Sequence, residues 1–319
     1  MKVLVTGANG FVGHAVWLHL DGMSSVTVRG SVRRVGVADA GGLLVPVGEI
    51  SAQTDWSAAL LGIQTVVHAA ARVHVMQEAA ADPLEEFRRV NVQGTLNLAR
   101  RAASEGVRRF VFVSSIKVNG EATRPGSAVK TEDAPSPLDA YGVSKMEAEQ
   151  GLRELSKQTG MEVVIIRPPL VYGPGVKANF AAMMRWLRRG IPLPLGAIHN
   201  QRSLVSLDNL VDLIVTCLTH PAAANQTFLV SDGEDLSTTQ LLRRMGAALG
   251  KPARLIPVPV LAFKLGAALV GKPELAQRLC GSLQVDISKT RELLGWCPPF
   301  SVDEGLKKAA EGSLRETAV

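Results

Sequence analysis

The residues best suited to chemistry in this chain are Tyr141 and Lys145, in the stretch Tyr141-Gly142-Val143-Ser144-Lys145. Two residues four apart on a helix lie on the same face, one turn from each other. An ammonium group beside a phenol favours the phenolate and lowers the pKa of the tyrosine from about 10. Such a tyrosine can serve as a general acid or base. The same spacing is common on amphipathic helices without a catalytic role, so the rest of the chain has to decide.

A glycine-rich turn near the start of the chain has the context of a dinucleotide site. Lys2 to Thr6 is an apolar run typical of a buried parallel strand, and a helical pattern follows the glycines. Gly7 permits a tight turn, Gly10 lets the backbone approach a pyrophosphate, and Gly13 lets the helix pack on the strand. The free amides at the start of that helix would face the phosphates. The residues predicted to bind the dinucleotide here are Gly7, Gly10, Phe11, Val12 and Gly13.

The residue that closes the second predicted strand, 26–32, bears on the form of the cofactor. An acidic side chain there would bind the adenosine ribose and favour NAD. This chain has Arg33 and Arg34 instead, and a guanidinium can pair with the 2′-phosphate of NADP. The alternative is two solvated loop arginines. We favour NADP(H), with NAD(H) as the alternative.

Strands and helices alternate up to about residue 170, with further strands predicted at 43–47, 65–69, 109–113 and 162–167. This pattern predicts a doubly wound parallel α/β sheet with helices on both faces. The carboxyl ends of such strands form one ligand crevice, which would collect Gly7, Arg33, Ala69, Ser115 and Pro168. We predict a dinucleotide-binding domain over 1–170. Residues 171–319 would form a smaller, partly interleaved substrate domain, with a buried helix near 260–270.

Composition excludes several other classes of protein. The net charge is +6, aromatic residues make up 4%, and the basic residues are scattered, so nucleic-acid binding is poorly supported. The three cysteines are far apart and form no metal-binding or disulfide pattern. No apolar run reaches the length of a membrane span, and no signal peptide is evident. We therefore expect a cytoplasmic protein without a metal site.

Seven motifs in order make the chain resemble the extended short-chain dehydrogenase/reductases, in the NAD-dependent epimerase/dehydratase group that acts on nucleotide sugars. The resemblance covers nearly the whole chain and implies a Rossmann-like fold. The motifs are Thr6-Gly7-Ala8-Asn9-Gly10-Phe11-Val12-Gly13, His68-Ala69-Ala70-Ala71, Asn91-Val92-Gln93-Gly94-Thr95, Val113-Ser114-Ser115, Tyr141-Gly142-Val143-Ser144-Lys145, Arg167-Pro168-Pro169-Leu170-Val171-Tyr172-Gly173-Pro174-Gly175 and Leu294-Gly295-Trp296.

The resemblance implies roles for individual residues. Ser115 would hydrogen-bond the oxygen on the reacting sugar carbon, Tyr141 would give or take its proton, and Lys145 would hold the nicotinamide ribose. The remaining cofactor residues would be Arg33, Arg34, Glu49, Ile50, Ala69, Ala70, Ala71, Asn91 and Pro168. The substrate residues would be Ser115, Lys117, Tyr141, Asn179, Arg202 and Arg278.

Departures from the family pattern narrow the reaction. The 4,6-dehydratases follow the catalytic hydroxyl with an Asp-Glu pair, whereas Ser115 is followed by Ile116-Lys117, so we reject a dehydratase. The 4-epimerases that retain NAD carry an acidic residue at the position of Arg33. An arginine there is similar to the pattern of NADPH-using reductases. Asn119 replaces the usual tyrosine of a Val-Tyr-Gly motif, which changes the sugar pocket.

Three hypotheses follow. The first is a reductase that delivers hydride from NADPH to C4 of a UDP-2-acetamido-2,6-dideoxy-4-keto-hexose, as in bacterial O-antigen and polysaccharide assembly. The second is a UDP-N-acetylglucosamine or UDP-glucose 4-epimerase. The third is a non-catalytic NADP-sensing regulator, which the presence of Tyr141, Lys145 and Ser115 disfavours. The family also implies a homodimer through a four-helix bundle of helices near 83–105 and 137–158; alternatively, these helices pack only on the sheet.

Overall fold

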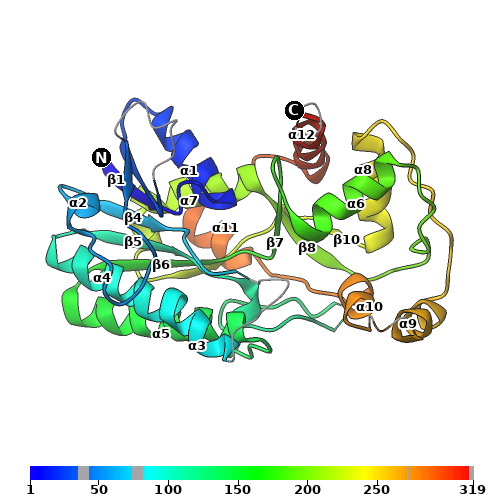
Figure 1. The fold of residues 1–319 in the computed structure, drawn as a ribbon, viewed down its shortest axis with the longest axis horizontal. Helices are drawn as coiled ribbons and strands as arrows, with labels where there is room; N and C mark the ends of the chain where they lie inside the picture. The colour runs from blue at the N-terminus through cyan, green and yellow to red at the C-terminus, as the bar shows by residue number, and fades with distance from the viewer. Residues whose placement is uncertain (35–42, 74–81, 125, 270, 272, 316–319) are drawn as a thin grey trace.

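The structure is a computed structural model that describes residues 1–34, 43–73, 82–124, 126–269, 271 and 273–315. Within these residues, seven parallel strands form one sheet in the order β3-β2-β1-β4-β5-β6-β9. The predicted doubly wound parallel sheet is thus confirmed (Figure 1). The strands are β1 (Lys2–Thr6), β2 (Thr27–Val32), β3 (Leu44–Pro46), β4 (Thr65–His68), β5 (Arg109–Val113), β6 (Glu162–Arg167) and β9 (Thr227–Leu229).

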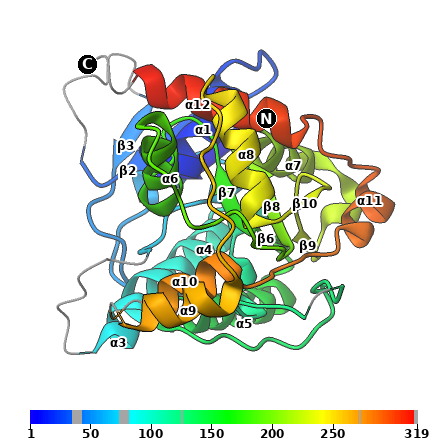
Figure 2. The same cartoon turned by 90° about the vertical axis from the view of Figure 1, so that its right-hand side faces the viewer.

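Both faces of the sheet are covered by helices, which explains why its central strands are largely apolar and buried. On β1, Val3 and Val5 join the core under α1 (Phe11–Asp21) and α7 (Leu207–Thr219). The intervening Leu4 faces the opposite core, under α4 (Thr95–Ser104) and α5 (Ala140–Thr159). Figures 1 and 2 show these two helical layers on either side of the sheet. Additional short elements are α2 (Ser57–Leu60), α11 (Ser288–Leu294) and the turns η2 (Ile116–Val118) and η3 (Pro221–Ala223).

A smaller three-stranded sheet carries the second core. Its order is β10-β8-β7, formed by Asp235–Leu236, Arg202–Ser206 and Leu170–Tyr172. Helices α6 (Ala178–Arg188), α8 (Thr238–Ala248) and α12 (Val302–Arg315) pack on it around Tyr172 and Phe180. Since β9 lies beyond residue 170 and still joins the large sheet, the chain returns to it after the small sheet has begun. The domain boundary at residue 170 itself stays a prediction.

Several predicted elements differ from those observed. The single helix predicted over 83–105 is interrupted: α3 (Pro83–Phe87) leads into a π-helical turn, η1 (Arg88–Gly94), before α4 begins. Strands β7, β9 and β10 have two or three residues, too few for a periodic pattern to reveal them. The helix α10 (Pro273–Cys280) was also not predicted.

The prediction of a buried helix near 260–270 is wrong. Helix α9 (Val260–Leu269) has no buried residue, and Leu261, Leu265 and Leu269 are 71%, 59% and 88% exposed. The helix packs chiefly beside α10 rather than under the sheet (Figure 2). Its apolar composition predicted burial, but composition does not show which elements pack against a helix. No helix in the described ranges has both the length and the apolar character needed to cross a bilayer.

The packing of α1 on β1 generates a first prediction. A Cβ atom at Gly13 would lie 2.2 Å from the Gly7 carbonyl oxygen, and backbone cannot yield as a flexible side chain would. We expect Gly13→Ala to lower the free energy of unfolding by roughly 1–3 kcal/mol, as overpacking does elsewhere. Denaturant unfolding measures this. Gly266, in α9, has nothing within 4 Å of an added Cβ, so Gly266→Ala is the matched control. Equal stability of the two variants would contradict this account of the turn.

Candidate active site

The helix that carries Tyr141 begins at a side-chain cap. The Asp139 carboxylate accepts a hydrogen bond of 2.7 Å from the Gly142 N–H, which satisfies a free amide of the first turn of α5. A Cβ at Gly142 would lie 2.7 Å from the Lys117 carbonyl oxygen. The first turn of α5 is therefore in close contact with the turn that follows Ser115, and this contact brings the two motifs together.

Ser115 lies just beyond β5 and caps η2. Its hydroxyl accepts a hydrogen bond of 3.2 Å from the Lys117 N–H, and it lies close enough to the Tyr141 phenol to lower the pKa of that group. The structure thus brings the predicted hydroxyl pair into contact. A substrate oxygen placed against both groups would meet two donors at once, the arrangement that stabilises a developing alkoxide.

Lys145 is 2% exposed and lies one turn along from Tyr141. Its ammonium donates to the Val113 carbonyl oxygen at 2.9 Å and lies 4.4 Å from the centre of the Phe112 ring and 5.9 Å from that of Tyr141. Burial lowers the pKa of Lys145 to about 7, against the opposing effect of the Glu149 carboxylate. The group is therefore a buried cation close to its titration point.

The expectation of a Tyr141 pKa below its usual value of about 10 is wrong for the protein without cofactor. Burial raises the pKa of the Tyr141 hydroxyl, the Asp139 carboxylate raises it further, and the hydrogen bond from Ser115 opposes both. Desolvation is the largest effect because a buried phenolate would lose its hydration. A cationic group bound beside the ring would favour the phenolate, as an opposite charge does.

The glycine turn fits a dinucleotide. Gly7 has a φ of +67°, and a Cβ there would lie 3.0 Å from the Ala70 Cα, so the end of β4 lies against this turn. Gly10 caps α1 without a side-chain hydrogen bond, which leaves amides of the first turn available for an anion. Nearby, Ser31 Oγ is buried without a hydrogen-bond partner among the described residues. These features support Gly7, Gly10, Phe11, Val12, Gly13, Ala69, Ala70 and Ala71 as the cradle of a pyrophosphate and ribose.

The residues predicted at the adenosine end are exposed. Arg33 and Arg34 follow β2 directly, and residues 35–42 lie outside the described part. Glu49 is mostly exposed, at 3.8 Å from Arg89, while Ile50 packs where a Cβ of Gly94 would lie.

Asn91 lies in the π-helical turn and is 1% exposed. Its amide accepts from the Arg72 N–H and donates to the Arg72 carbonyl and to the Ser144 hydroxyl, at 2.8 to 3.0 Å. These bonds tie the segment after β4 to α5. The wider turn places Asn91 between them, in keeping with the frequent occurrence of π turns at functional sites. The role predicted for Asn91 at the nicotinamide stays a prediction.

His68 was not singled out from the sequence, yet it connects two motifs. Nδ1 lies 2.7 Å from the Thr6 hydroxyl and Nε2 lies 2.9 Å from the Thr95 hydroxyl. The Thr6 hydroxyl also accepts a hydrogen bond of 3.2 Å from the Ala70 N–H, and a neutral imidazole donates from one ring nitrogen and accepts at the other. Burial, and secondly the charge of Lys145, lower the pKa of His68 to about 3. The histidine is therefore a neutral bridge under the crevice.

Two predicted substrate residues are already engaged by the protein. The Lys117 ammonium pairs with Glu121 at 2.7 Å and with Asp139, and these carboxylates raise its pKa. Arg202 donates to the carbonyl oxygens of Arg278 and Gly281 at 2.8 and 3.2 Å, which joins β8 to the end of α10. Burial lowers the pKa of Arg202. The side chains of Asn179 and Arg278 are exposed, and their roles, like that of Pro168, stay predictions.

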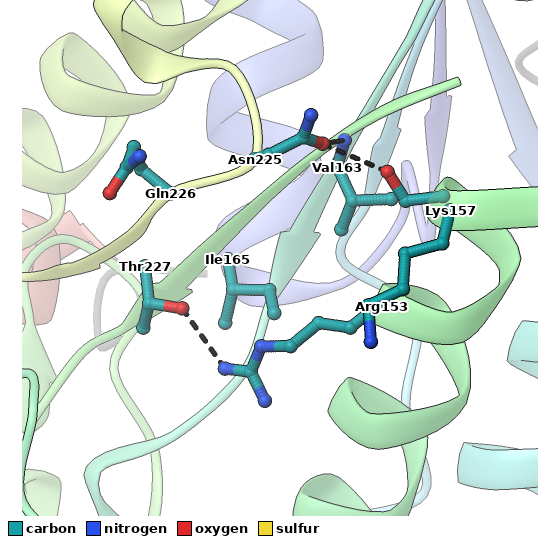
Figure 3. A pocket seen from close by; sticks show the side chains of 8 residues that line it. Arg153, Lys157, Val163, Ile165, Asn225, Gln226 and Thr227 are labelled. Carbon is teal, nitrogen blue, oxygen red and sulfur yellow. Dashed lines mark hydrogen bonds between the residues drawn. The ribbon is translucent and has the colours of Figure 1, made fainter. Parts of the chain in front are cut away.

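A cavity of about 270 Å³ lies elsewhere, beside the amino-terminal halves of β6 and β9 (Figure 3). Arg153 reaches across it to the Thr227 hydroxyl, and Asn225 bonds the Val163 N–H. Since ligands of parallel α/β sheets bind at the opposite, carboxyl ends of the strands, this cavity is not the active site. No cluster of three or more potential metal ligands occurs within the described ranges.

The two tyrosines of the chain, Tyr141 and Tyr172, allow a direct test of the pKa directions. In a Tyr172→Phe background, Tyr141 is the sole phenol, and phenolate absorbance reports its ionisation. We expect a midpoint above about 10 without cofactor and a lower midpoint with saturating NAD⁺ or NADP⁺, whose nicotinamide is cationic. The Tyr141→Phe/Tyr172→Phe protein is the control for absorbance changes on unfolding. A midpoint at or below 10 without cofactor would refute the dominance of burial.

His68 predicts a pH dependence of stability. Its pKa is about 3 in the fold and near 6.5 when unfolded, so the unfolded chain binds the extra proton between these values. Stability is therefore lost as the pH falls from about 6.5 towards 3, with a slope of up to about 1.4 kcal/mol per pH unit from this group. Denaturant unfolding at several pH values should give a smaller slope for His68→Gln than for wild type. The exposed His19→Gln should match wild type, and equal slopes for all three would remove His68 from the account.

The chain is similar to known proteins in both sequence and structure. A model of the NAD dependent epimerase/dehydratase family matches residues 3–231. The chain is 53% identical over 315 residues to a UDP-glucose 4-epimerase of Vibrio cholerae, covering 98% of this chain and 96% of that protein. It is 28% identical to a UDP-glucose 4-epimerase of Mycolicibacterium smegmatis, with 98% of each covered. A UDP-glucuronic acid 4-epimerase from Bacillus cereus, solved with UDP-glucuronic acid and NAD, superposes with a TM-score of 0.79 at 23% identity, over 99% of this chain and 100% of that one. The chain belongs to the NAD dependent epimerase/dehydratase family, whose members here include nucleotide-sugar epimerases.

Proposed function

We propose that this enzyme is a UDP-hexose 4-epimerase. The observation that carries the proposal is the identity of 53%, over almost the whole chain, to a protein described as a UDP-glucose 4-epimerase. The contact of Ser115 with Tyr141 beside the buried Lys145 supports it chemically. The sequence alone placed a 4-ketoreductase first, on the strength of Arg33, and this identity supports the epimerase more strongly.

In the first half of the reaction, Tyr141 takes the proton of the sugar 4-hydroxyl while Ser115 holds the same oxygen. The nicotinamide, when bound, accepts a hydride from C4 and later returns it. Lys145 keeps a positive charge beside the phenol, which favours the phenolate form required for the base. The turn at Gly7 and the amides of α1 would hold the dinucleotide, which would supply the hydride acceptor.

In the second half, the 4-keto sugar turns and presents its other face. Tyr141 then gives the proton back to the C4 oxygen, while Ser115 stabilises the negative charge that develops on it. The sugar must pivot about its diphosphate, which Arg202 and Arg278 would hold at the junction of β8 and α10. Asn179 and Lys117 complete the proposed sugar-nucleotide site.

A second candidate is the 4-ketoreductase of a UDP-2-acetamido-2,6-dideoxy-4-keto-hexose in polysaccharide assembly. Arg33 and Arg34 favour it, because their exposed guanidinium groups directly after β2 suit the 2′-phosphate of NADPH. Tyr141 would then protonate the alkoxide, which Ser115 stabilises, once for each NADPH consumed. This candidate uses NADP(H) as its cofactor. For either reaction we propose a cytoplasmic location and a homodimer through α4 and α5.

The test supplies purified enzyme with UDP-glucose or UDP-N-acetylglucosamine and a trace of NAD⁺ or NADP⁺, and follows the C4 epimers by NMR. We expect interconversion without stoichiometric loss of cofactor. Tyr141→Phe should lower kcat by about 10²–10⁴-fold, since it removes the general acid and base. Epimer formation undiminished in Tyr141→Phe would refute the role of the tyrosine.

A parallel reaction with NADPH and the 4-keto-6-deoxy sugar separates the candidates. Stoichiometric loss of NADPH, with no epimerisation of either UDP-hexose, would replace the epimerase by the reductase. Arg33→Ala tests the cofactor: it should weaken binding of NADP⁺ about tenfold and leave that of NAD⁺ within about twofold, because one charge-assisted pair is lost. An equal effect on both would show that Arg33 does not read the 2′-phosphate.

A further inference from the structure

A buried ion pair lies directly behind the active site, between Glu149 on α5 and Arg167 at the end of β6. The side chains are 1% and 3% exposed. The Glu149 carboxylate accepts two hydrogen bonds from Arg167, at 2.8 and 2.5 Å, and one of 3.0 Å from Arg153. Buried charges cost several kcal/mol of desolvation each, so a pair of this kind is weak evidence for stability by itself. The position of the pair, in contact with both ends of the Ser115 turn, points instead to a role in the active site.

The pair holds both ends of the turn that presents Ser115. On one side, the Ser114 hydroxyl donates to Glu149 at 2.7 Å. On the other side, Arg167 donates to the Asn119 side-chain oxygen at 2.9 Å. Ser115 caps the turn η2 that lies between these two anchors. The residues that flank the reactive hydroxyl are therefore fixed through one carboxylate and one guanidinium.

The same carboxylate acts on the other half of the site. Glu149 follows Lys145 by one helical turn, and its negative charge raises the pKa of that lysine against the effect of burial. The other titratable or charged groups around this point are Tyr141 on α5, neutral His68 on β4 and Arg167 on β6. Glu149 is thus the acidic group that counters the desolvation of Lys145.

We propose that Glu149 and Arg167, extended by Asn119, are positioning residues that set the Ser115 turn against Tyr141 and Lys145. Asn119 is the residue that departs from the tyrosine of the family motif, and its short amide reaches Arg167 on one side while donating to the Asp133 carbonyl on the other. The departure then has a structural purpose: it locks the Ser115 turn through the ion pair rather than through the sugar pocket.

The experiment compares Glu149→Gln and Asn119→Ala with Glu154→Gln, a control on the exposed side of the same helix whose carboxylate pairs with Lys157. For Glu149→Gln we expect kcat to fall at least about tenfold with KM within about twofold, because misplacing a reacting group affects turnover rather than binding. The alkaline limb of the kcat profile should move about one pH unit lower, since Lys145 loses its nearby anion. Asn119→Ala should lower kcat without moving that limb, because the charges remain.

A purely structural role would change only the unfolding temperature. An unchanged kcat and pH profile in Glu149→Gln, with lower thermal stability, would overturn the proposal. If Glu149→Gln does not fold, Asn119→Ala decides, because it removes the two side-chain hydrogen bonds of Asn119, with Arg167 and with the Asp133 carbonyl, and leaves the ion pair intact. An unchanged kcat in Asn119→Ala would also overturn the proposal. Glu154→Gln should match wild type in every readout.

The inference rests on the proposed function only for its choice of assay. Wild-type turnover is measured first with the UDP-hexoses and with the 4-keto sugar plus NADPH. If wild type shows no epimerase activity but reduces the 4-keto sugar, the same variants are compared in the reductase assay. The Ser115 turn and Lys145 serve the same proton transfer at the C4 oxygen in both reactions. Failure of the positioning role instead leaves wild-type turnover intact and the variants equal to it.

Discussion

Holding the Lys145 ammonium in a nearly water-free place is the constraint on which the rest of the site depends. The charge rests on the Val113 carbonyl and the face of Phe112, both supplied by the carboxyl end of β5. Burial pushes its pKa to about 7, so small changes in the surrounding charge decide whether it is an ammonium at all. The end of β5 and the Glu149 carboxylate of the ion pair supply the groups that offset the desolvation of this ammonium.

A second layer of buried polar bonds gives the crevice its shape. His68 bridges Thr6 and Thr95, Asn91 bridges the segment after β4 and α5, and Glu149 bridges β5, β6 and α5. Each bridge crosses between elements distant in sequence, and each is satisfied within the protein. Fully satisfied buried networks rigidify a site, whereas a half-satisfied one would cost free energy. The reactive groups are therefore preorganised by bonds that the substrate never touches.

The two sides of the active site differ in how firmly they are built. The cofactor side rests on the seven-stranded sheet and on glycines that leave no room for a Cβ atom. The proposed substrate side lies at the junction of β8 and α10, where Arg202 donates to the backbone carbonyls of Arg278 and Gly281. Binding groups carried outside the main core can vary without disturbing the fold, so one fold can serve several substrates.

Local sequence patterns determined much of this protein. Continuous Val-rich runs predicted the buried parallel strands, the spacing of Gly7, Gly10 and Gly13 predicted the phosphate turn, and the spacing of Tyr141 and Lys145 placed both on one helical face. These features depend on residues close in the chain, which periodicity and backbone sterics govern. The absence of an acid after Ser115 likewise required no structure.

Tertiary structure alone decided the features that depend on distant neighbours. The π-helical turn around Asn91, the return of β9 to the sheet, the exposure of α9 and the bridging role of His68 all arise between segments far apart in sequence. The raised pKa of Tyr141 and the occupation of Lys117 by two carboxylates belong to the same class. The physical reason is that burial and charge at one atom are sums over every element packed around it, whereas a sequence pattern records only the neighbours along the chain.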